Sequence, residues 1–460
     1  MSVSLLDRLR AKLGNTGVLA SADAMAPFLT DWRGVFSGKA LAVARPANTG
    51  EVTDVVRICV EAGVAIVPQG GNTGLAAGAT PVGLDSAVVV NVSRMRSIRG
   101  IDSRGNTIAL DAGCVLSDVQ SAAKEAGRLF PLSLAAEGSA QIGGLIATNA
   151  GGTAVLRYGS MRSLVLGLEV VLADGTIVNG MRSLRKDNAG YDWKQWFIGS
   201  EGTLGIVTGS VLRLFPAPRT MLTALVAIES LEAAMDVFWR AQDDFGELLV
   251  GAEVFPDRAV ALRLGQEPKQ AFPLQRNAWY LLLEVASSLD GANDVLETAL
   301  VRLVEELGVD CAVAQSASQR DALWEWRETI GETEKRAGKS AKHDVSVPVS
   351  AIPAFVRDAT AAIEGAFADC PVLAFGHAGD GNVHFNVMLP PDDSVSATAV
   401  NAVVHEIVVR YDGSITAEHG IGRYRRSELR QSRSAVELEM MNGLKRALDP
   451  LGVMNPGAVL

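Results

Sequence analysis

FGHAGDGNVHFN, residues 375–386, is the stretch around which the chain is organised. Its Asp380-Gly381 pair is a strong signal for a two-residue hairpin loop, because both central positions of a type I′ turn need a positive φ. Such a turn places His377 directly opposite His384 on one face of two antiparallel strands. Asn386 lies two residues beyond His384 and therefore points to the same face. We expect a hairpin that brings two imidazoles and an amide to one spot.

Histidine is scarce in this chain, which has five: His343, His377, His384, His405 and His419. A packed or hydrogen-bonded pair on a solvated face is the plainer interpretation of two facing histidines. However, His419 follows Glu418 in a second glycine-punctuated turn, AEHGIG. Two histidines and one carboxylate form the ligand set of open sites for Zn²⁺ or a similar ion. The sequence therefore predicts a metal at His377, His384 and Glu418, and we leave His343 and His405 as structural.

The composition is that of a globular protein with two or three domains. The chain has 460 residues, of which 48% are hydrophobic and 20% are charged. Its net charge of −10 argues against a nucleic-acid binder and against binding to an anionic membrane. The four cysteines have no CxxC spacing, which favours reduced thiols in the cytoplasm over a disulfide framework.

We expect neither a membrane-spanning helix nor a signal peptide in this sequence. No apolar run approaches the ~18 residues of a membrane-spanning helix. The first residues, MSVSLLDRLRAKL, carry Asp7, Arg8 and Arg10 where a signal peptide is purely apolar. They predict an amphipathic helix, and we expect no integral membrane segment.

Short strands and helices alternate in the N-terminal half, which indicates a mixed α/β domain. We expect strands at 40–46, 65–68, 87–92 and 106–113. The apolar spacing of 51–63 predicts a helix, and a capping box from Ser117 to Gln120 opens another that stops at Gly127. Residues 164–180 predict a hairpin with an Asp174-Gly175 turn.

Three glycine-rich regions lie in this half of the chain, at 69–79, 135–163 and 187–218. One such cluster alone is more often an ordinary irregular loop, and the chain has neither GxGxxG nor GxxxxGK[ST]. Glycine permits backbone conformations closed to other residues, so N–H groups can converge on a phosphate. Three regions together indicate an extended ligand bound mainly by backbone, and a dinucleotide fits that length.

Longer helices and apolar strands without glycine clusters follow from Met221. We expect strands at 247–255 and 279–287 and a helix at 294–308 closed by Gly308. A helix over 318–332 carries Arg327, and a strand carries Lys342. A solvated surface is the usual position for either charge. Two neighbouring tryptophans can partly desolvate Arg327, and a bidentate grip on a carboxylate is then stronger.

Six motifs, in order and at consistent spacing, resemble the FAD-dependent D-2-hydroxyacid dehydrogenases of the vanillyl-alcohol oxidase and p-cresol methylhydroxylase superfamily. They are PQGGNTG (68–74), EGSAQIGGLIATNAGG (137–152), GSEGTLGIVT (199–208), GHAGDGNVH (376–384), TAEHGIG (416–422) and NPG (455–457). The resemblance implies an α+β fold with an FAD-binding domain of two α+β subdomains at 1–218. It further implies a substrate or cap domain with an antiparallel sheet at 219–405 and a C-terminal segment at 406–460 that packs back on the FAD domain.

The resemblance also implies roles for individual residues. The FAD-binding positions are Pro68, Gly70, Gly71, Asn72, Thr73, Gly74, Ser133, Glu137, Gly138, Ser139, Gly143, Gly144, Asn149, Gly152, Gly205, Ile206 and Asn455. The first glycine-rich loop has no histidine, so we expect non-covalent FAD. Arg327 and Lys342 anchor the substrate carboxylate, and Asn386 positions a substrate oxygen. The hydroxyglutarate branch has threonine four residues after this arginine, where the present chain has Gly331.

The expected reaction is oxidation of D-2-hydroxyglutarate to 2-oxoglutarate. A divalent metal, Zn²⁺ or alternatively Mn²⁺, lowers the pKa of the substrate hydroxyl, His419 is the general base, and a hydride passes to the flavin. A D-lactate or glycolate dehydrogenase is the alternative within the family. An oxidase that uses O₂ and a non-enzymatic zinc protein with structural FAD are alternatives of other classes. The expected partners are a small hydroxyacid, an external acceptor such as an electron-transfer flavoprotein or a quinone, and a second copy of the chain in a homodimer.

Overall fold

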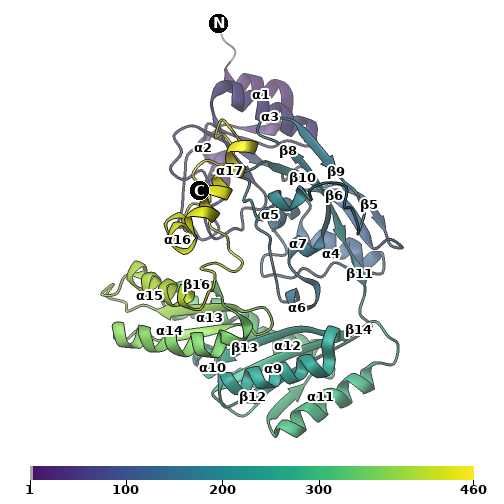
Figure 1. Cartoon of the computed structure of the whole chain (residues 1–460), viewed down its shortest axis with the longest axis vertical. Coiled ribbons are helices and arrows are strands. Elements are labelled where there is room, and N and C mark those ends of the chain that lie inside the picture. The colour runs from purple at the N-terminus through teal and green to yellow at the C-terminus, as the bar shows by residue number, and fades with distance from the viewer. Residues whose placement is uncertain (1–3) are drawn as a thin grey trace. The chain divides into compact units, whose positions relative to one another are not determined.

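The computed structural model describes residues 4–460 and divides the chain into two compact units (Figure 1). The first unit comprises Met1–Gly152, Gly159–Ala217 and Glu418–Leu460. The second comprises Thr153–Tyr158 and Pro218–Ala417. The second unit therefore ends at 417, not at the expected 405, because helix α15 (Ala397–Arg410) runs through that position and packs on α14 and β16.

A four-stranded sheet with the order β1-β2-β4-β3 begins the first unit. The strands β2, β4 and β3 run parallel, and β1 is antiparallel to β2. Its strands are β1 (Val18–Leu19), β2 (Ala42–Ala44), β3 (Ala65–Gln69) and β4 (Ala87–Asn91). The helices of this part are α1 (Leu5–Leu13), α2 (Ala22–Leu29) and α3 (Thr49–Ala62).

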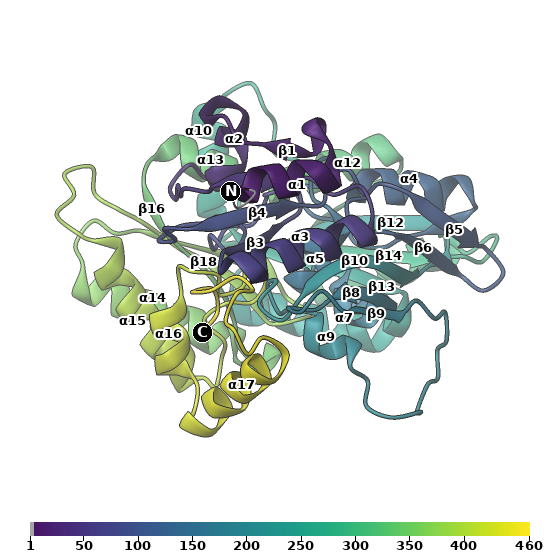
Figure 2. The ribbon, with the colours of Figure 1, turned by 90° about the horizontal axis from the view of Figure 1, so that it is seen from above.

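The helix expected at 51–63 forms as α3 for identifiable local reasons. The Asn48 side chain accepts a hydrogen bond from the Glu51 N–H, which caps the start of the helix. Gly63 ends it in the left-handed conformation. The apolar face of α3 is buried, and α1 lies beside it in both views (Figures 1 and 2). The amphipathic helix predicted at the N-terminus thus forms as α1, while residues 1–3 of that prediction lie outside the described residues.

A five-stranded antiparallel sheet with the order β5-β6-β10-β8-β9 follows in the first unit. Its strands are β5 (Ile98–Asp102), β6 (Thr107–Asp111), β8 (Val165–Val171), β9 (Ile177–Gly180) and β10 (Ile206–Arg213). The helices of this part are α4 (Leu116–Glu125), α5 (Ile142–Ala147), α7 (Met161–Leu164) and α8 (Lys194–Phe197). The predicted hairpin at 164–180 forms as the β8–β9 pair.

The capping box expected at Ser117 is wrong. Helix α4 begins at Leu116 with Val115 at its N-cap, and no side chain caps it. Ser117 already lies in the first turn of the helix. The Gln120 side chain donates from Nε2 to the Leu132 carbonyl at 2.8 Å, so it does not bond back to the start of the helix.

The C-terminal segment belongs to the first unit and pairs with strand β3. Ile66 donates from its N–H to the Val453 carbonyl at 2.8 Å, and Asn455 donates to the Ile66 carbonyl at 2.7 Å. The helices of this segment are α16 (Arg426–Ser432) and α17 (Ala435–Leu448). A short ribbon of β7 (Arg128–Leu129) and β11 (Phe215–Pro216) completes the unit.

The second unit is built on one antiparallel sheet with the order β15-β12-β14-β13-β17-β18-β16. Its strands are β12 (Thr220–Ile228), β13 (Leu249–Pro256), β14 (Trp279–Ser287), β15 (Asp310–Val313), β16 (Ser340–Ser346), β17 (Val372–His377) and β18 (Asn382–Met388). Its helices are α6 (Val155–Tyr158), α9 (Leu231–Phe245), α10 (Asp257–Gln266), α11 (Asn293–Leu307), α12 (Ala317–Glu328), α13 (Ile330–Ala337), α14 (Ile352–Ala366) and α15.

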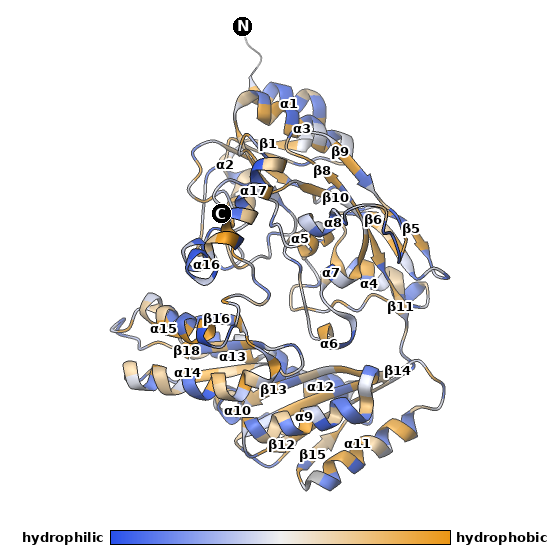
Figure 3. Cartoon of the chain, viewed as in Figure 1, coloured by the Kyte–Doolittle hydropathy of each residue, from blue (hydrophilic) through white to orange (hydrophobic). Residues whose placement is uncertain are grey.

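Helices cover both faces of this sheet. Residues of α10, α12 and α13 share a buried core with Leu225, Leu282 and Phe375, whereas α9 and α14 pack on the opposite face. The strands carry mostly hydrophobic residues, and α9 and α11 alternate hydrophobic with hydrophilic turns (Figure 3). The single helix expected at 318–332 is wrong, because the chain breaks at Thr329 into α12 and α13. Within the described residues, no helix is long and apolar enough to cross a membrane.

Candidate active site

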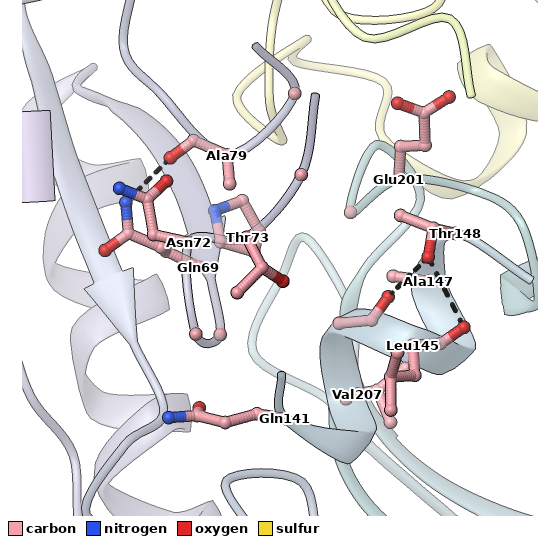
Figure 4. A pocket seen from close by; sticks show the side chains of 18 of the residues that line it. Gln69, Asn72, Thr73, Ala79, Gln141, Leu145, Ala147, Thr148, Glu201 and Val207 are labelled. Atoms are coloured by element: carbon pink, nitrogen blue, oxygen red, sulfur yellow. Dashed lines mark hydrogen bonds between the residues drawn. The ribbon is translucent and has the colours of Figure 1, made fainter. Parts of the chain in front are cut away.

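A pocket in the first unit is lined by glycine-rich stretches that are far apart in the sequence (Figure 4). The loop after β3, helix α5 and the start of β10 form its wall. Gly71 packs directly on the backbone of another loop, because a Cβ at this position would lie 2.0 Å from the Ser139 carbonyl oxygen. Only glycine permits this approach, which joins two of the glycine-rich regions on one wall.

The polar groups on this wall suit a nucleotide-like ligand. Gln141 lines the pocket, and its Oε1 is buried without a hydrogen-bond partner among the described residues. A buried acceptor of this kind calls for a donor, which a bound ligand can supply. Gln69 donates instead to the Ala79 carbonyl at 2.9 Å (Figure 4), so its amide holds the loop after β3 in place.

Glu201 ties the C-terminal segment to the same pocket. Its carboxylate accepts hydrogen bonds from the N–H groups of Ile421 and Gly422, each at 2.8 Å. Burial raises the pKa of Glu201 above its usual value, although these two N–H groups act in the opposite direction. His419 lies just before the bonded residues and lines the pocket. The segment that carries His419 is therefore held against the wall by backbone bonds.

The histidine hairpin of the second unit has a different register from the one we expected. His384 lies opposite Phe375 and Val383 lies opposite Gly376, so the loop has four residues, 378–381, and not two. Of the Asp380-Gly381 pair, only Gly381 has a positive φ, at 84°, so the type I′ turn does not form. The Asp380 Oδ1 instead accepts from the Asn382 N–H at 3.0 Å.

The two imidazoles nevertheless meet, as predicted. Because strand side chains alternate with period two, a register shift of two positions leaves both histidines on the same face. The ring centroids of His377 and His384 are 5.6 Å apart. The predicted face is therefore confirmed, whereas the predicted turn and direct pairing are wrong.

His377 is bonded to a buried carboxylate on the neighbouring strand. The Nδ1 atom of His377 lies 2.5 Å from Oε1 of Glu253, which is fully buried on β13. The other carboxylate oxygen accepts a hydrogen bond from Arg327 Nε at 2.8 Å. Burial raises the pKa of Glu253, but the charges of His377 and Arg327 outweigh it and hold that pKa below its ordinary value. The Arg327 guanidinium also lies over the Phe375 ring, 4.8 Å from its centroid.

His384 and Glu418 complete a possible metal-ligand group. His384 Nδ1 lies 3.6 Å from the buried carboxylate of Asp344 on β16. The carbonyl of Asp344 accepts a hydrogen bond from the Ala417 N–H at 2.9 Å, and Glu418 is the next residue along the chain. Potential ligand atoms of His377, His384 and Glu418 all lie within 4.8 Å of one another. Two imidazoles and one carboxylate fit a divalent metal with open coordination positions.

Lys342 and Asn386 meet at a second buried acid, Glu334 of α13. Asn386 lies opposite Lys342 in the β16–β18 pair. Its Nδ2 donates to Glu334 Oε2 at 2.6 Å, and Lys342 Nζ lies 3.4 Å from the same oxygen. Glu334 has no exposed surface, whereas the Lys342 side chain is 42% exposed. The sheet face that carries the histidines therefore also carries an amide and an exposed cation.

Known proteins resemble this chain over most of its length. Residues 40–180 match the family model of the FAD binding domain, and residues 217–459 match that of the C-terminal domain of FAD linked oxidases. The D-2-hydroxyglutarate dehydrogenase of Stutzerimonas stutzeri is 35% identical over 463 residues, which cover 99% of this chain and 98% of the relative. The mitochondrial enzyme of that name from Danio rerio is 37% identical over 93% of this chain and 79% of the relative.

The chain belongs to the FAD-linked oxidase family. The two D-2-hydroxyglutarate dehydrogenases just described are relatives of this chain, so the predicted FAD-dependent dehydrogenase family is confirmed. The crystal structure of p-cresol methylhydroxylase shares the fold, with a TM-score of 0.77 at 17% identity over 99% of this chain and 96% of that one. The predicted fold class is confirmed by this likeness.

The predicted cofactor positions of this FAD-linked oxidase fall into two groups. Those on the pocket wall are Pro68, Gly70, Gly71, Asn72, Thr73, Gly74, Gly143, Gly144, Gly205 and Ile206. The others do not line the pocket: Ser133, Glu137, Gly138, Ser139, Asn149, Gly152 and Asn455. Several of these hold the surrounding loops. Asn149 Oδ1 accepts from the Arg162 N–H at 2.9 Å, and Asn455 Nδ2 donates to the Glu201 carbonyl at 2.8 Å.

Four polar residues at these sites were not predicted from the sequence: Gln141, Glu253, Glu334 and Asp344. A signal was available for Glu253, which stands alone among apolar residues in the strand LVGAEVF. A carboxylate inside an apolar strand is buried only when it has a partner, so a cation that pairs with Glu253 could have been expected. His343, one of the two histidines expected to be structural, is hydrogen-bonded away from the metal-ligand group: its Nε2 lies 2.9 Å from Asn401 Oδ1.

Proposed function

We propose that this FAD-linked oxidase oxidises D-2-hydroxyglutarate to 2-oxoglutarate and passes the electrons to an external acceptor. The observation that carries the proposal is that the histidines His377 and His384 share one sheet face of the second unit with Lys342, while Arg327 of helix α12 bonds Glu253 beside His377. The relatives that match nearly the whole chain carry the name of that activity. A five-carbon diacid has a second carboxylate, which would use the two cations.

The cofactors supply chemistry that no side chain of this protein has. When bound, FAD accepts the two electrons removed from the substrate, and a divalent metal lowers the pKa of the substrate hydroxyl. The unpartnered Gln141 oxygen and the close packing at Gly71 are features of a wall built around a ligand, which supports FAD in the first unit. The acceptor is an electron-transfer flavoprotein or a quinone in this proposal.

The protein side chains bind the substrate and move one proton. His377, His384 and Glu418 would hold a divalent metal, which we assign as Zn²⁺ with Mn²⁺ as the alternative. Arg327 and Lys342 bind the distal carboxylate, and Asn386 orients an oxygen near the reacting carbon. His419, adjacent to the ligand Glu418, accepts the hydroxyl proton at its imidazole, the group that most often acts as a general base in enzymes.

The proposal also covers how FAD is attached and in which compartment the enzyme works. The loop after β3 has no histidine, which supports non-covalent FAD, and denaturation should then release the flavin into solution. The four cysteines are all free thiols, which supports a reducing compartment such as the cytoplasm. Both statements are parts of the proposal and have their own direct tests.

The proposal is tested by the substrate that reduces the flavin. Under anaerobic conditions, a panel of D-2-hydroxyacids is mixed with the FAD-loaded protein and the loss of flavin absorbance is recorded. D-2-hydroxyglutarate should bleach the flavin most rapidly, and L-2-hydroxyglutarate should not. No bleaching by any D-2-hydroxyacid would overturn the proposal.

D-lactate or glycolate is the second candidate substrate. One observation favours it: at Gly331, four residues after Arg327, a Cβ would meet no heavy atom within 4 Å. The threonine of the hydroxyglutarate branch could be accommodated there, yet this chain has none. The same panel decides, because faster bleaching by D-lactate or glycolate would favour the three- or two-carbon acid.

A further inference from the structure

The carboxylate of Glu253 connects two residues that have different proposed tasks. One oxygen bonds the proposed metal ligand His377 at Nδ1, and the other accepts from Arg327 Nε. Glu253 lies on the central part of the sheet, directly opposite His377 in the β13–β17 pair. It has no exposed surface, so both bonds form without competition from water.

The bond to Glu253 determines which nitrogen of His377 carries a proton. An ionised carboxylate only accepts hydrogen bonds, so the Nδ1 atom that faces it must be the protonated one. The opposite nitrogen, Nε2, is then the atom that can donate its lone pair to a metal. Metal-bound histidines in proteins usually have such a carboxylate or carbonyl behind them, and its loss weakens metal binding.

The second bond orients the guanidinium of Arg327. Glu253 takes the Nε–H of this side chain, while the Phe375 ring lies against the guanidinium plane. Both contacts leave the two terminal nitrogens as the fork that can grip a carboxylate in a bidentate manner. The one carboxylate of Glu253 therefore orients both the proposed metal ligand His377 and the proposed substrate anchor Arg327.

We infer that Glu253 is a positioning residue that fixes His377 with its proton on Nδ1 and Nε2 as the metal-ligating atom, and that orients Arg327 toward the substrate carboxylate. This inference rests on the proposed metal and substrate roles of those two residues. Glu253 itself touches neither substrate nor cofactor in this assignment. Glu253 lies outside the six sequence motifs, 124 positions before His377.

Glu253→Gln is the informative variant. An amide has one acceptor oxygen and one donor NH₂, so it cannot accept from both His377 and Arg327. When the oxygen keeps Arg327, the NH₂ faces Nδ1 and moves the His377 proton to Nε2. Glu284→Gln is a matched control, because Glu284 is also buried in this sheet but bonds Thr223 and Trp324, which have no proposed role.

Metal affinity is measured on the FAD-loaded proteins, stripped of metal, by competition for Zn²⁺ with a chromophoric chelator. The Zn²⁺ affinity of Glu253→Gln should fall by about 10–100-fold, whereas that of Glu284→Gln should match the wild type. The KM for D-2-hydroxyglutarate should also rise in Glu253→Gln alone. Equal Zn²⁺ affinities in Glu253→Gln and wild type would overturn the inference.

A spectroscopic measurement on the wild type covers the case in which Glu253→Gln does not fold. Selective ¹⁵N labelling of the histidines gives few signals, and comparison with His377→Gln identifies those of His377. The metal-free wild type should show His377 with its proton on Nδ1, and a proton on Nε2 would overturn the inference. A wild type with the Nδ1 proton that takes up no divalent metal would instead overturn the proposed metal site.

Discussion

Asn386 donates a hydrogen bond from Nδ2 to Glu334 Oε2 at 2.6 Å, and both side chains are buried at the sheet face that carries His384. The same carboxylate oxygen lies 3.4 Å from Lys342 Nζ. Glu334 thus holds two of the residues proposed to bind the substrate. The orientation of the Asn386 amide and the position of the Lys342 ammonium both depend on this one acid.

Glu334→Ala should therefore raise the KM for the substrate and lower stability. Removing the acid leaves a buried amide without a partner, which costs about 1–3 kcal/mol. Steady-state kinetics and thermal unfolding measure the two effects. Glu332→Ala is the control, because Glu332 lies on the same helix with a side chain that is 71% exposed. An unchanged KM and an unchanged melting temperature in Glu334→Ala would show that this acid positions nothing.

Lys342→Met should separate the two candidate substrates. A distal carboxylate that uses both cations loses one charge-assisted hydrogen bond, worth about 1.5–3 kcal/mol, so its KM should rise by roughly 10–150-fold. A three-carbon acid leaves one cation idle, so its KM should change little. Kinetics with D-2-hydroxyglutarate and D-lactate provide the comparison. A rise in KM for D-lactate alone would contradict the proposal that Lys342 binds the distal carboxylate of D-2-hydroxyglutarate.

Removal of the metal should stop flavin reduction by the substrate without releasing FAD. EDTA-treated protein is assayed for metal content, flavin content and reduction by D-2-hydroxyglutarate, and Zn²⁺ is then added back. We expect reduction to return on addition, because His377, His384 and Glu418 remain in place. Full activity in protein shown to be metal-free would dismiss the metal from the mechanism.

A charge network in the first unit predicts how stability depends on pH. Arg99 binds Glu169 at 2.8 Å and Asp111 at 2.7 Å. Burial raises the pKa of Glu169, but hydrogen bonds from Arg99 and Thr49 outweigh it and hold that pKa below its ordinary value. The contribution of Glu169 to stability is therefore present above the pKa of the unfolded state and is lost as the pH falls through the lower folded-state pKa.

Glu169→Gln should accordingly lower the free energy of unfolding at neutral pH, and it should lower this free energy less at acidic pH. Urea unfolding of the wild type and the variant at about pH 7 and about pH 4 gives the difference in unfolding free energy at each pH. This difference should shrink on acidification. A difference that grows as the pH falls would contradict the lowered pKa of Glu169.

The strands and the face of the histidine hairpin could be predicted from the sequence, but its loop could not. Apolar runs such as WYLLLEVAS formed the expected strands because their side chains had a core to fill. The register failed because the Asp380 side chain accepts from the Asn382 N–H, and this bond competes with the type I′ turn. The two histidines still shared a face because an even shift preserves the alternation of side chains.

Tertiary partners account for most of what the sequence did not reveal. Glu253 and Glu334 act through residues far along the chain, and no local pattern marks such a pairing. The break between α12 and α13 has a local cause, since the Thr329 hydroxyl donates to the Glu325 carbonyl at 2.6 Å and β-branched residues favour helix less. Family motifs located the glycine-rich wall, but Gln141 emerged only from its buried and unpartnered oxygen.

The most direct test of the proposed reaction is anaerobic flavin reduction by D-2-hydroxyglutarate in His419→Asn, compared with the wild type and with His405→Asn. His419 lines the cofactor pocket, whereas His405 lies on helix α15 of the second unit. Loss of a general base should slow flavin reduction by about 10²–10⁴-fold in His419→Asn, with FAD still bound and His405→Asn unaffected. Reduction at the wild-type rate in His419→Asn would contradict the assignment of His419 as the base and, with it, the proposed mechanism.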